Sequence, residues 1–305
     1  MMTSFFAILP IFLLILVGYA SKRWVLNDDG WWKQADRLVY YLFFPALLIL
    51  DVSKADFSGG ETSAAIAATM LATLAVGVLI FLGQAFVKAR NELFTSIFQG
   101  GIRYNSYVFI ALAHSLYGVE GVALSGVFVA YLIVLTNVMS VLVMNHFANT
   151  GRKSLAGVFG ALLKNPLIIA AMLGLALNGL GVNVSGAIEH FMSYLAGAAT
   201  PLSLMSVGAG LMLNLQANRV LATFYVVGLK LMLMPMITFG LLLALGVSGV
   251  AANVALLYAC VPCAGNAYIL ARQMGGDAPA MASMITWTTL VSTLSITLIL
   301  GTLML

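Results

Sequence analysis

Charged residues are scarce in this chain. Only 8% of its 305 residues are Asp, Glu, Lys or Arg, whereas soluble domains carry about 25%, so a soluble globular protein is excluded. Hydrophobic residues make up 62% of the chain, and the mean hydropathy is +1.05. Continuous apolar runs of about 20 residues, each long enough to cross a bilayer as a helix, recur from end to end. The runs do not alternate in polarity, which excludes a transmembrane β-barrel.

Catalytic and metal-binding motifs are also missing. The chain has no H-E-x-x-H, no G-x-S-x-G, no Walker motif and no Asp pair within an apolar segment. Its histidines, His114, His146 and His190, are scattered over three segments. Its two cysteines, Cys260 and Cys263, form a C-x-x-C without any soluble βαβ context, so we interpret them as packing residues. We therefore expect no enzyme, no ATP-driven pump, and no resident cofactor or metal ion.

The apolar runs predict an all-α membrane protein with ten transmembrane helices. The N-terminal run continues to Tyr19 without a basic region before it, so we expect a first span rather than a cleaved signal. The longest connection, Ser21–Ala35, carries Trp24, Trp31 and Trp32, which is typical of an aromatic belt at the headgroups. The predicted spans are 5–22, 36–52, 64–87, 93–116, 120–146, 157–180, 187–212, 220–245, 250–272 and 279–304.

Lysine and arginine gather at one set of segment ends, as they do on the cytoplasmic side of membrane proteins. With the N-terminus outside, only Lys54 lies outside, while ten basic residues are cytoplasmic: Lys22, Arg23, Lys33, Arg37, Lys88, Arg90, Arg152, Lys153, Arg219 and Arg272. This predicts a multi-pass protein of the cell inner (plasma) membrane with both termini outside. The pI near 9.1 comes from these basic residues at the ends of the spans. It therefore does not indicate nucleic-acid binding, and we expect membrane lipids and no nucleic acid as partners.

Proline spacing indicates an internal repeat. Pro45 follows Pro10 by 35 residues, and Pro201 follows Pro166 by 35 residues. The sequences around these prolines are also similar: "ILPIFLLILVGYA" resembles "KNPLIIAAMLGLA", and "FFPALLIL" resembles "ATPLSLMS". We interpret the chain as two related units.

The two units are residues 1–147 and 157–305, each with five spans. Because five is odd, the second unit must lie inverted in the membrane, which gives a 5+5 inverted repeat. Asn105 follows the second proline of its unit by 60 residues, and Asn266 by 65. Inverted repeats with interrupted helices in matching positions are typical of secondary transporters and mark the binding site.

The ninth predicted span contains helix-breaking residues beside a polar one. In "CVPCAGNAYILARQ", Pro262 removes a backbone donor, Gly265 permits unusual dihedral angles, and Asn266 offers both a donor and an acceptor. Freed backbone groups are costly at membrane depth unless they line a cavity. A binding site is one interpretation, and a proline kink with an Asn that serves helix packing is the other.

The matching place in the fourth span is "QGGIRYNSY", with Gly100, Gly101, Arg103 and Asn105. We predict that discontinuous helices 4 and 9 meet there and that Asn105 and Asn266 face a solute. Arg103 lies about ten residues inside its span, where a charge is costly and marks a functional site by default. Its guanidinium would grip a carboxylate. Alternatively, Arg103 reaches the interface or pairs structurally.

Two lysines also lie within predicted spans. Lys230, in "GLKLMLMP", is about ten residues deep, and it either lines the cavity or acts as a structural counter-charge. Lys164 is nearer a segment end, so we interpret it as structural.

Carboxylates are absent from the middle of every predicted span, whereas a proton or sodium exchanger would be expected to hold one or two there. Hydroxyl groups on the last span offer either helix packing or a sodium site, so Na+ or H+ remains a candidate coupling ion. These hydroxyls are spaced three or four residues apart at Thr286, Thr289, Thr293 and Thr297.

An ordered set of segments resembles the bacterial members of the auxin efflux carrier family, which includes the plant PIN proteins and carriers of malonate or malate. The resemblance covers essentially the whole chain and rests on "ILPIFLLILVGYASKRW", "DRLVYYLFFPALLIL", "IRYNSYVFIALA", "KNPLIIAAMLGL", "GLKLMLMP" and "NAYILARQMGGD".

This resemblance implies a ten-helix fold related to the bile acid–sodium symporters. It implies a scaffold of helices 1, 2, 6 and 7, a transport domain of helices 3–5 and 8–10, an elevator-like motion and a homodimer. The crossover positions carried onto this chain are Asn105 and the stretch Pro262 to Asn266. One departure is that the fourth span lacks a proline, so its break would depend on Gly100, Gly101 and Asn105.

The sequence therefore predicts a secondary transporter of small organic anions, mono- or dicarboxylates. Its predicted substrate-binding residues are Arg103, Asn105, Lys230, Pro262, Gly265 and Asn266. A cation/proton exchanger on a similar scaffold is the alternative, and a membrane sensor that binds without transport is a third reading.

Overall fold

The computed structural model describes residues 2–54, 61–147, 157, 160, 163–213 and 219–303. Every element in these ranges is a helix, and none is a strand. The helices are α1 (Met2–Trp24), α2 (Asp29–Leu38), η1 (Val39–Phe43), α3 (Phe44–Lys54), α4 (Glu61–Val87), α5 (Asn91–Ile102), α6 (Ser106–Phe147), α8 (Pro166–Gly179), α9 (Gly186–Ala209), α10 (Val220–Gly228), η3 (Leu229–Leu233), α11 (Met234–Ala244), α12 (Gly249–Cys260), α13 (Ala267–Met274) and α14 (Ala278–Leu303).

Four helical segments of the described chain are long and apolar enough to cross a bilayer: Glu61–Phe86, Asn91–Phe147, Val220–Ala244 and Ala278–Leu303. Two shorter helices, Pro166–Gly179 and Gly249–Cys260, are also apolar. Large hydrophobic side chains are exposed along α4, among them Leu71, Val78 and Leu82, as expected for a surface that faces lipid. The described part of the chain is therefore all-helical, and its apolar helices are compatible with a membrane protein.

Local sequence signals account for several helix ends. Asn165 caps α8, because its side-chain oxygen accepts from the N–H of Leu167 at 2.9 Å, and proline follows at the first helical position. Gly118 has φ +58° and ψ −140°, which kinks α6 between the predicted spans 93–116 and 120–146. The predicted connection 148–156 and much of the start of span 157–180 lie outside the described residues.

One predicted connection is wrong in part. The stretch Ser21–Ala35 was expected to be a loop with a belt of tryptophans, but helix α2 begins within it at Asp29. Trp32 is buried, and its indole N–H donates to the carbonyl of Leu26 at 2.9 Å. Trp24, in contrast, is 80% exposed. Trp24 lies at the end of α1, outside α2. Within α2 the amphipathic pattern buries Trp32 and leaves Trp31 41% exposed, because one face of this helix packs inward.

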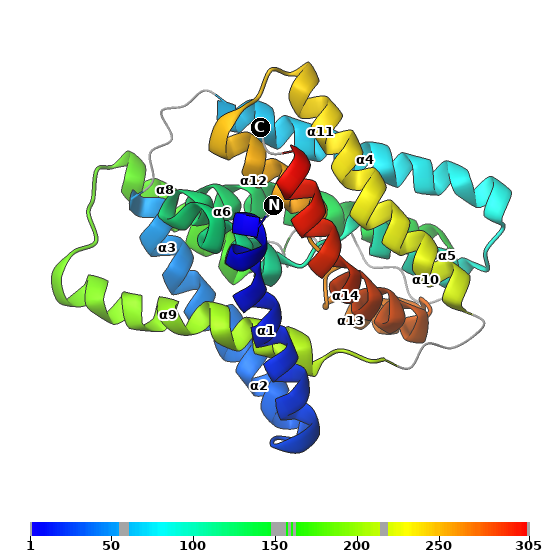
Figure 1. Cartoon of the computed structure of the whole chain (residues 1–305), viewed down its shortest axis with the longest axis horizontal. Helices are drawn as coiled ribbons and strands as arrows, with labels where there is room; N and C mark the ends of the chain where they lie inside the picture. The colour runs from blue at the N-terminus through cyan, green and yellow to red at the C-terminus, as the bar shows by residue number, and fades with distance from the viewer. Residues whose placement is uncertain are drawn as a thin grey trace.

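The helices pack in two groups of pairs. Helix α1 crosses α9 and α3 packs along α8, while α4 packs against α11 and α12, and α10 against α14. Figure 1 shows α1 (blue) crossing α9 (green) on one side of the molecule, and α4 (cyan) crossing α11 (yellow) on the other. Helix α6 contacts elements of both groups.

Candidate functional site

Two interrupted helices meet inside the protein. Helix α5 ends at Ile102 and α6 begins at Ser106, with Arg103 extended between them (φ −78°, ψ 150°). Helix α12 ends at Cys260 and α13 begins at Ala267, and Val261 is likewise extended (φ −71°, ψ 152°). The break in the fourth predicted span therefore forms without a proline.

The backbones of the two breaks touch. The N–H of Asn105 donates to the carbonyl of Pro262 at 2.8 Å, although 157 residues separate them in the chain. This bond gives a partner to two backbone groups that would otherwise be unpaired in an apolar interior. The polar segments that the sequence singled out are thus brought together at one crossing.

Asn105 and Asn266 differ in what their side chains do there. Asn105 is buried, and its side-chain oxygen caps α6 by accepting from the N–H groups of Tyr107 at 3.1 Å and Val108 at 3.2 Å. Asn266 is exposed and makes no cap bond to α13. Its side-chain oxygen instead accepts from Arg103 Nη2 at 3.1 Å.

Arg103 is only 6% exposed. Apart from the bond to Asn266, its Nε and Nη1 have no hydrogen-bond partner among the described residues. Within the same part of the chain, no carboxylate forms an ion pair with it. Arg103 is therefore a buried cation that is largely uncompensated.

Lys230 is the second such cation. It lies in the π-helical turn η3 and is fully buried, and its Nζ has no hydrogen-bond partner in the described structure. Its Nζ lies 5.2 Å from the centroid of the Tyr258 ring, on the last turn of α12 before the break. The ring of Tyr104, the neighbour of Arg103, packs against the same ring at 4.8 Å, which places both cations near the crossing. Lys164, in contrast, is exposed.

The glycines were predicted to help interrupt the two helices, and this prediction is wrong. Gly265 has no positive φ, and a Cβ there would meet no atom within 4 Å. Gly100 and Gly101 lie inside α5, where a Cβ would come within 2.8 Å of Val226 and 2.4 Å of Ile80. These two glycines allow close helix packing, whereas Pro262 and the Asn105 cap account for the interruptions.

One residue that stabilises the break was missed. Thr288, on α14, accepts from the N–H of Cys263 at 3.2 Å and donates to the carbonyl of Met284 at 2.7 Å. The predicted hydroxyl stripe included its neighbours Thr286 and Thr289 instead. Thr286 accepts from the N–H of Met212 at 2.9 Å, and Thr289 donates to its own helix, so both have packing roles here.

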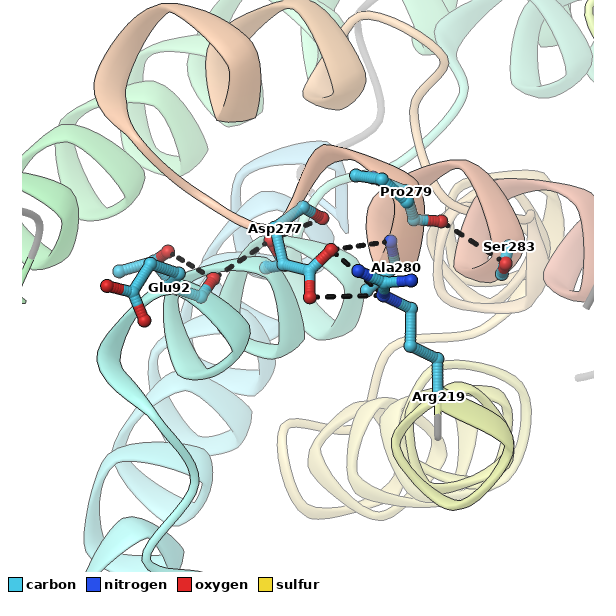
Figure 2. A network of polar contacts seen from close by, with 8 residues as sticks. Glu92, Arg219, Asp277, Pro279, Ala280 and Ser283 are labelled. Carbon is cyan, nitrogen blue, oxygen red and sulfur yellow. Dashed lines mark hydrogen bonds and ion pairs between the residues drawn. The ribbon is translucent and has the colours of Figure 1, made fainter. Parts of the chain in front are cut away.

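A second polar cluster fixes the far end of α13 (Figure 2). Arg219 Nε donates to both carboxylate oxygens of Asp277, at 3.0 and 3.1 Å. The same carboxylate accepts from the N–H of Ala280 at 3.0 Å and so caps α14. The N–H of Asp277 donates to the carbonyl of Glu92 at 2.9 Å, and Ser96 Oγ donates to the carbonyl of Asp277 at 3.1 Å. Asp277 therefore joins the starts of α5, α10 and α14.

Comparison with known proteins places these features in a family. The model of the "Membrane transport protein" family matches residues 3–300, which confirms the predicted resemblance to the auxin efflux carriers. An "Uncharacterized transporter" of Methanothermobacter thermautotrophicus is 24% identical over 95% of both chains. A "Putative malonate transporter" of Rhizobium meliloti is 26% identical over 95% of this chain and 92% of its own. An uncharacterized transporter of Methanocaldococcus jannaschii is 26% identical over 95% of this chain and 96% of its own.

Proposed function

We propose that this chain, which belongs to the membrane transport protein family, is a secondary carrier of small organic anions that binds a carboxylate at the crossing of its two interrupted helices. The substrates are mono- or dicarboxylates. Arg103 and Lys230 provide the positive charge, and Asn105, Pro262, Gly265 and Asn266 form the surrounding break.

The observation that carries this proposal is the pair of buried cations without a carboxylate partner in the described structure. Helix ends do not offset them. The C-termini of α5 and α12 and the N-termini of α6 and α13 meet at the breaks, and their partial charges, about half a unit each and of opposite sign, roughly cancel. Because an unpaired charge is costly out of water, an anion at this place would be strongly favoured.

The Asn266 side chain offers a route from solvent to the site. Asn266 is exposed, whereas the guanidinium to which it is bonded is buried. A carboxylate that replaced the Asn266 oxygen at Nη2 would meet the planar fork of N–H groups that arginine presents to carboxylates. It would exchange a neutral acceptor for a charged one.

The proposed architecture is a 5+5 inverted repeat of ten spans in the cell inner (plasma) membrane, with both termini on its outer side. The matching breaks support it. The helix contacts also support it, because α1, α3, α8 and α9 pack mainly on one another and α4, α10, α11, α12 and α14 do likewise, while α1 also touches α14 across the two groups. The first group corresponds to the scaffold, through which two copies would form a homodimer, and the second to a transport domain that moves as an elevator. Na+ or H+ is the coupling ion where one is used.

The relative named for malonate supports a small carboxylate as the substrate. The alternative, a cation/proton exchanger, needs a carboxylate at membrane depth. In the residues that the structure describes, neither buried cation has such a group as an ion-pair partner. This arrangement favours an anion as the transported species.

Thermal unfolding of the purified carrier against a panel of mono- and dicarboxylates, with and without sodium, tests the proposal. A ligand at about 100 times its dissociation constant stabilises a folded protein by about 2.7 kcal/mol. We expect a shift of the unfolding midpoint that is specific to carboxylates, absent in Arg103→Ala, and retained in the control Lys164→Ala. Shifts with sodium or pH alone would favour the exchanger, and an unchanged carboxylate shift in Arg103→Ala would contradict the anion site.

A further inference from the structure

The proposed anion site does not explain what holds the ammonium group of Lys230 in place before an anion binds. The side chain lies in a π-helical turn, a feature that often marks functional sites, and it is fully buried. Its Nζ donates no hydrogen bond within the described residues. An ammonium in such a place needs some other stabilising group.

The aromatic ring of Tyr258, on α12, is that group. Lys230 Nζ lies 5.2 Å from the centroid of this ring, within the range at which the negative face of an aromatic ring attracts a cation. Tyr258 is itself fully buried, so the attraction is not weakened by water.

The position of the ring is fixed from two sides. The hydroxyl oxygens of Tyr258 and Thr73 lie 2.7 Å apart, and Thr73 donates its single proton to the carbonyl of Thr69. Tyr258 therefore donates to Thr73 on α4. Tyr104 and Phe109 form T-shaped pairs with the ring, with centroids at 4.8 and 6.0 Å.

A ring holds a cation differently from a carboxylate. A carboxylate would occupy the N–H groups of the ammonium and neutralise its charge, so it would compete with an arriving anion. The face of a ring attracts the ammonium and accepts no strong hydrogen bond from it. All three donors of Lys230 stay available.

We infer that Tyr258 is a positioning residue for the anion site: its ring holds the Lys230 ammonium at the helix crossing while leaving its hydrogen-bond donors free for the substrate. This inference rests on the proposed function, because it assumes that an anion binds there. Neither the sequence pattern nor the family match assigns a role to Tyr258.

A double-mutant cycle tests it, with malonate as the probe and its dissociation constant measured by calorimetry on the purified full chain. Tyr258→Leu removes the ring, and we expect it to weaken malonate binding about 10- to 30-fold, as for a desolvated cation–π contact. In a Lys230→Met background the same substitution should change affinity less than about 3-fold. Tyr258→Phe keeps the ring and should stay within about 3-fold of the wild type.

Two further variants separate positioning from packing. Phe128→Leu removes another fully buried ring, one that has no ring contact with Tyr258 among the described residues, and it should leave malonate affinity nearly unchanged. Where Tyr258→Leu yields no folded carrier, phenylalanines with increasing fluorination in place of Tyr258 keep the shape and weaken the negative face. Affinity should then fall stepwise with fluorine number.

An equal loss on Tyr258→Leu in both backgrounds, or an affinity that is indifferent to fluorination, would overturn the inference while leaving the anion site intact. Failure of the proposed function looks different. In that case the wild type binds neither malonate nor any other carboxylate of the panel, or Arg103→Ala binds as tightly as the wild type. Either result would also refute the role inferred for Tyr258.

Discussion

The crossing of α1 and α9 offers a sharp test of packing, because two glycines let the backbones touch. A Cβ placed on Gly208 would lie 1.8 Å from the carbonyl oxygen of Ile15, and a Cβ on Gly18 would lie 1.9 Å from that of Met205. Ordinary contacts of a Cβ begin at 3.4 Å. Alanine at either position therefore requires the helices to separate by about 1.5 Å, since backbone atoms cannot rotate aside as side chains do.

Overpacking of this kind costs about 1–3 kcal/mol, and occasionally more. Replacing glycine by alanine also gains up to about 1 kcal/mol of helix propensity, which opposes the clash. Gly197 lies on the same helix α9, and a Cβ there would meet no atom within 4 Å. Because Gly197→Ala makes the same propensity gain without a clash, the difference between it and Gly208→Ala isolates the cost of the close approach. We expect that difference to be at least about 1–3 kcal/mol.

Reversible unfolding in mixed micelles, driven by SDS and followed by tryptophan fluorescence, measures the three variants on one scale. Gly208→Ala and Gly18→Ala should each unfold at lower SDS than the wild type, and Gly197→Ala at the same or higher SDS. Equal unfolding midpoints for Gly208→Ala and Gly197→Ala would refute the close crossing.

Two further predictions concern charged pairs. The side chain of Asp277 is 7% exposed and that of Arg219 is 16% exposed, so Arg219→Ala leaves a nearly buried carboxylate without its counter-charge and should lower the free energy of unfolding by about 2–4 kcal/mol. The same unfolding assay checks this, and a loss below about 0.5 kcal/mol would mark a merely surface pair. At the α1–α2 turn, the Lys22 ammonium lies 2.6 Å from the carboxylate of Asp29 and lowers the pKa of that carboxyl group. The stabilisation from this pair is therefore present above the ordinary carboxyl pKa and is lost as the pH falls through the lowered one. Carboxyl-carbon NMR should show the pKa of Asp29 rising toward its ordinary value in Lys22→Met, and an unchanged titration would argue against the pair.

The sequence was most informative where a local rule decides the structure. The apolar runs located the helical segments, since hydrocarbon thickness dictates their length. The break at Pro262 was predictable because proline removes a donor. The break at Arg103 was predicted from its correspondence to the other unit, and Gly100, Gly101 and Asn105 were assigned as its cause. In the structure Asn105 accounts for it through its cap and its bond to Pro262, whereas the two glycines lie within α5.

Contacts between distant segments could not be predicted. Thr288 reaches Cys263 across 25 residues, and Tyr258 reaches Thr73 across 185. The hydrophobic periodicity of one segment does not determine which side chains of another helix that segment contacts. For the same reason the sequence could not decide whether Lys230 lines a cavity or acts as a structural counter-charge. That choice depends on whether an acidic side chain of another helix lies opposite it.

The helix crossings give an independent argument for the proposed repeat. Gly18 lies eight residues after the first proline of its unit, and Gly174 lies eight residues after the corresponding proline of the other unit. Gly208 and Val52 likewise each lie seven residues after the second proline. In the structure Gly18 and Gly208 lie at the α1–α9 crossing, and a Cβ on Gly174 would lie 2.8 Å from Val52 Cβ at the α3–α8 crossing. The contact of α1 with α9 therefore has an equivalent in the contact of α8 with α3, and each contact joins one proposed unit to the other. A two-fold axis within the membrane plane requires such a pair of equivalent contacts. Because one of the four positions carries valine, the α3–α8 crossing is closed by a side chain rather than by backbone, and the two crossings need not be equally tight.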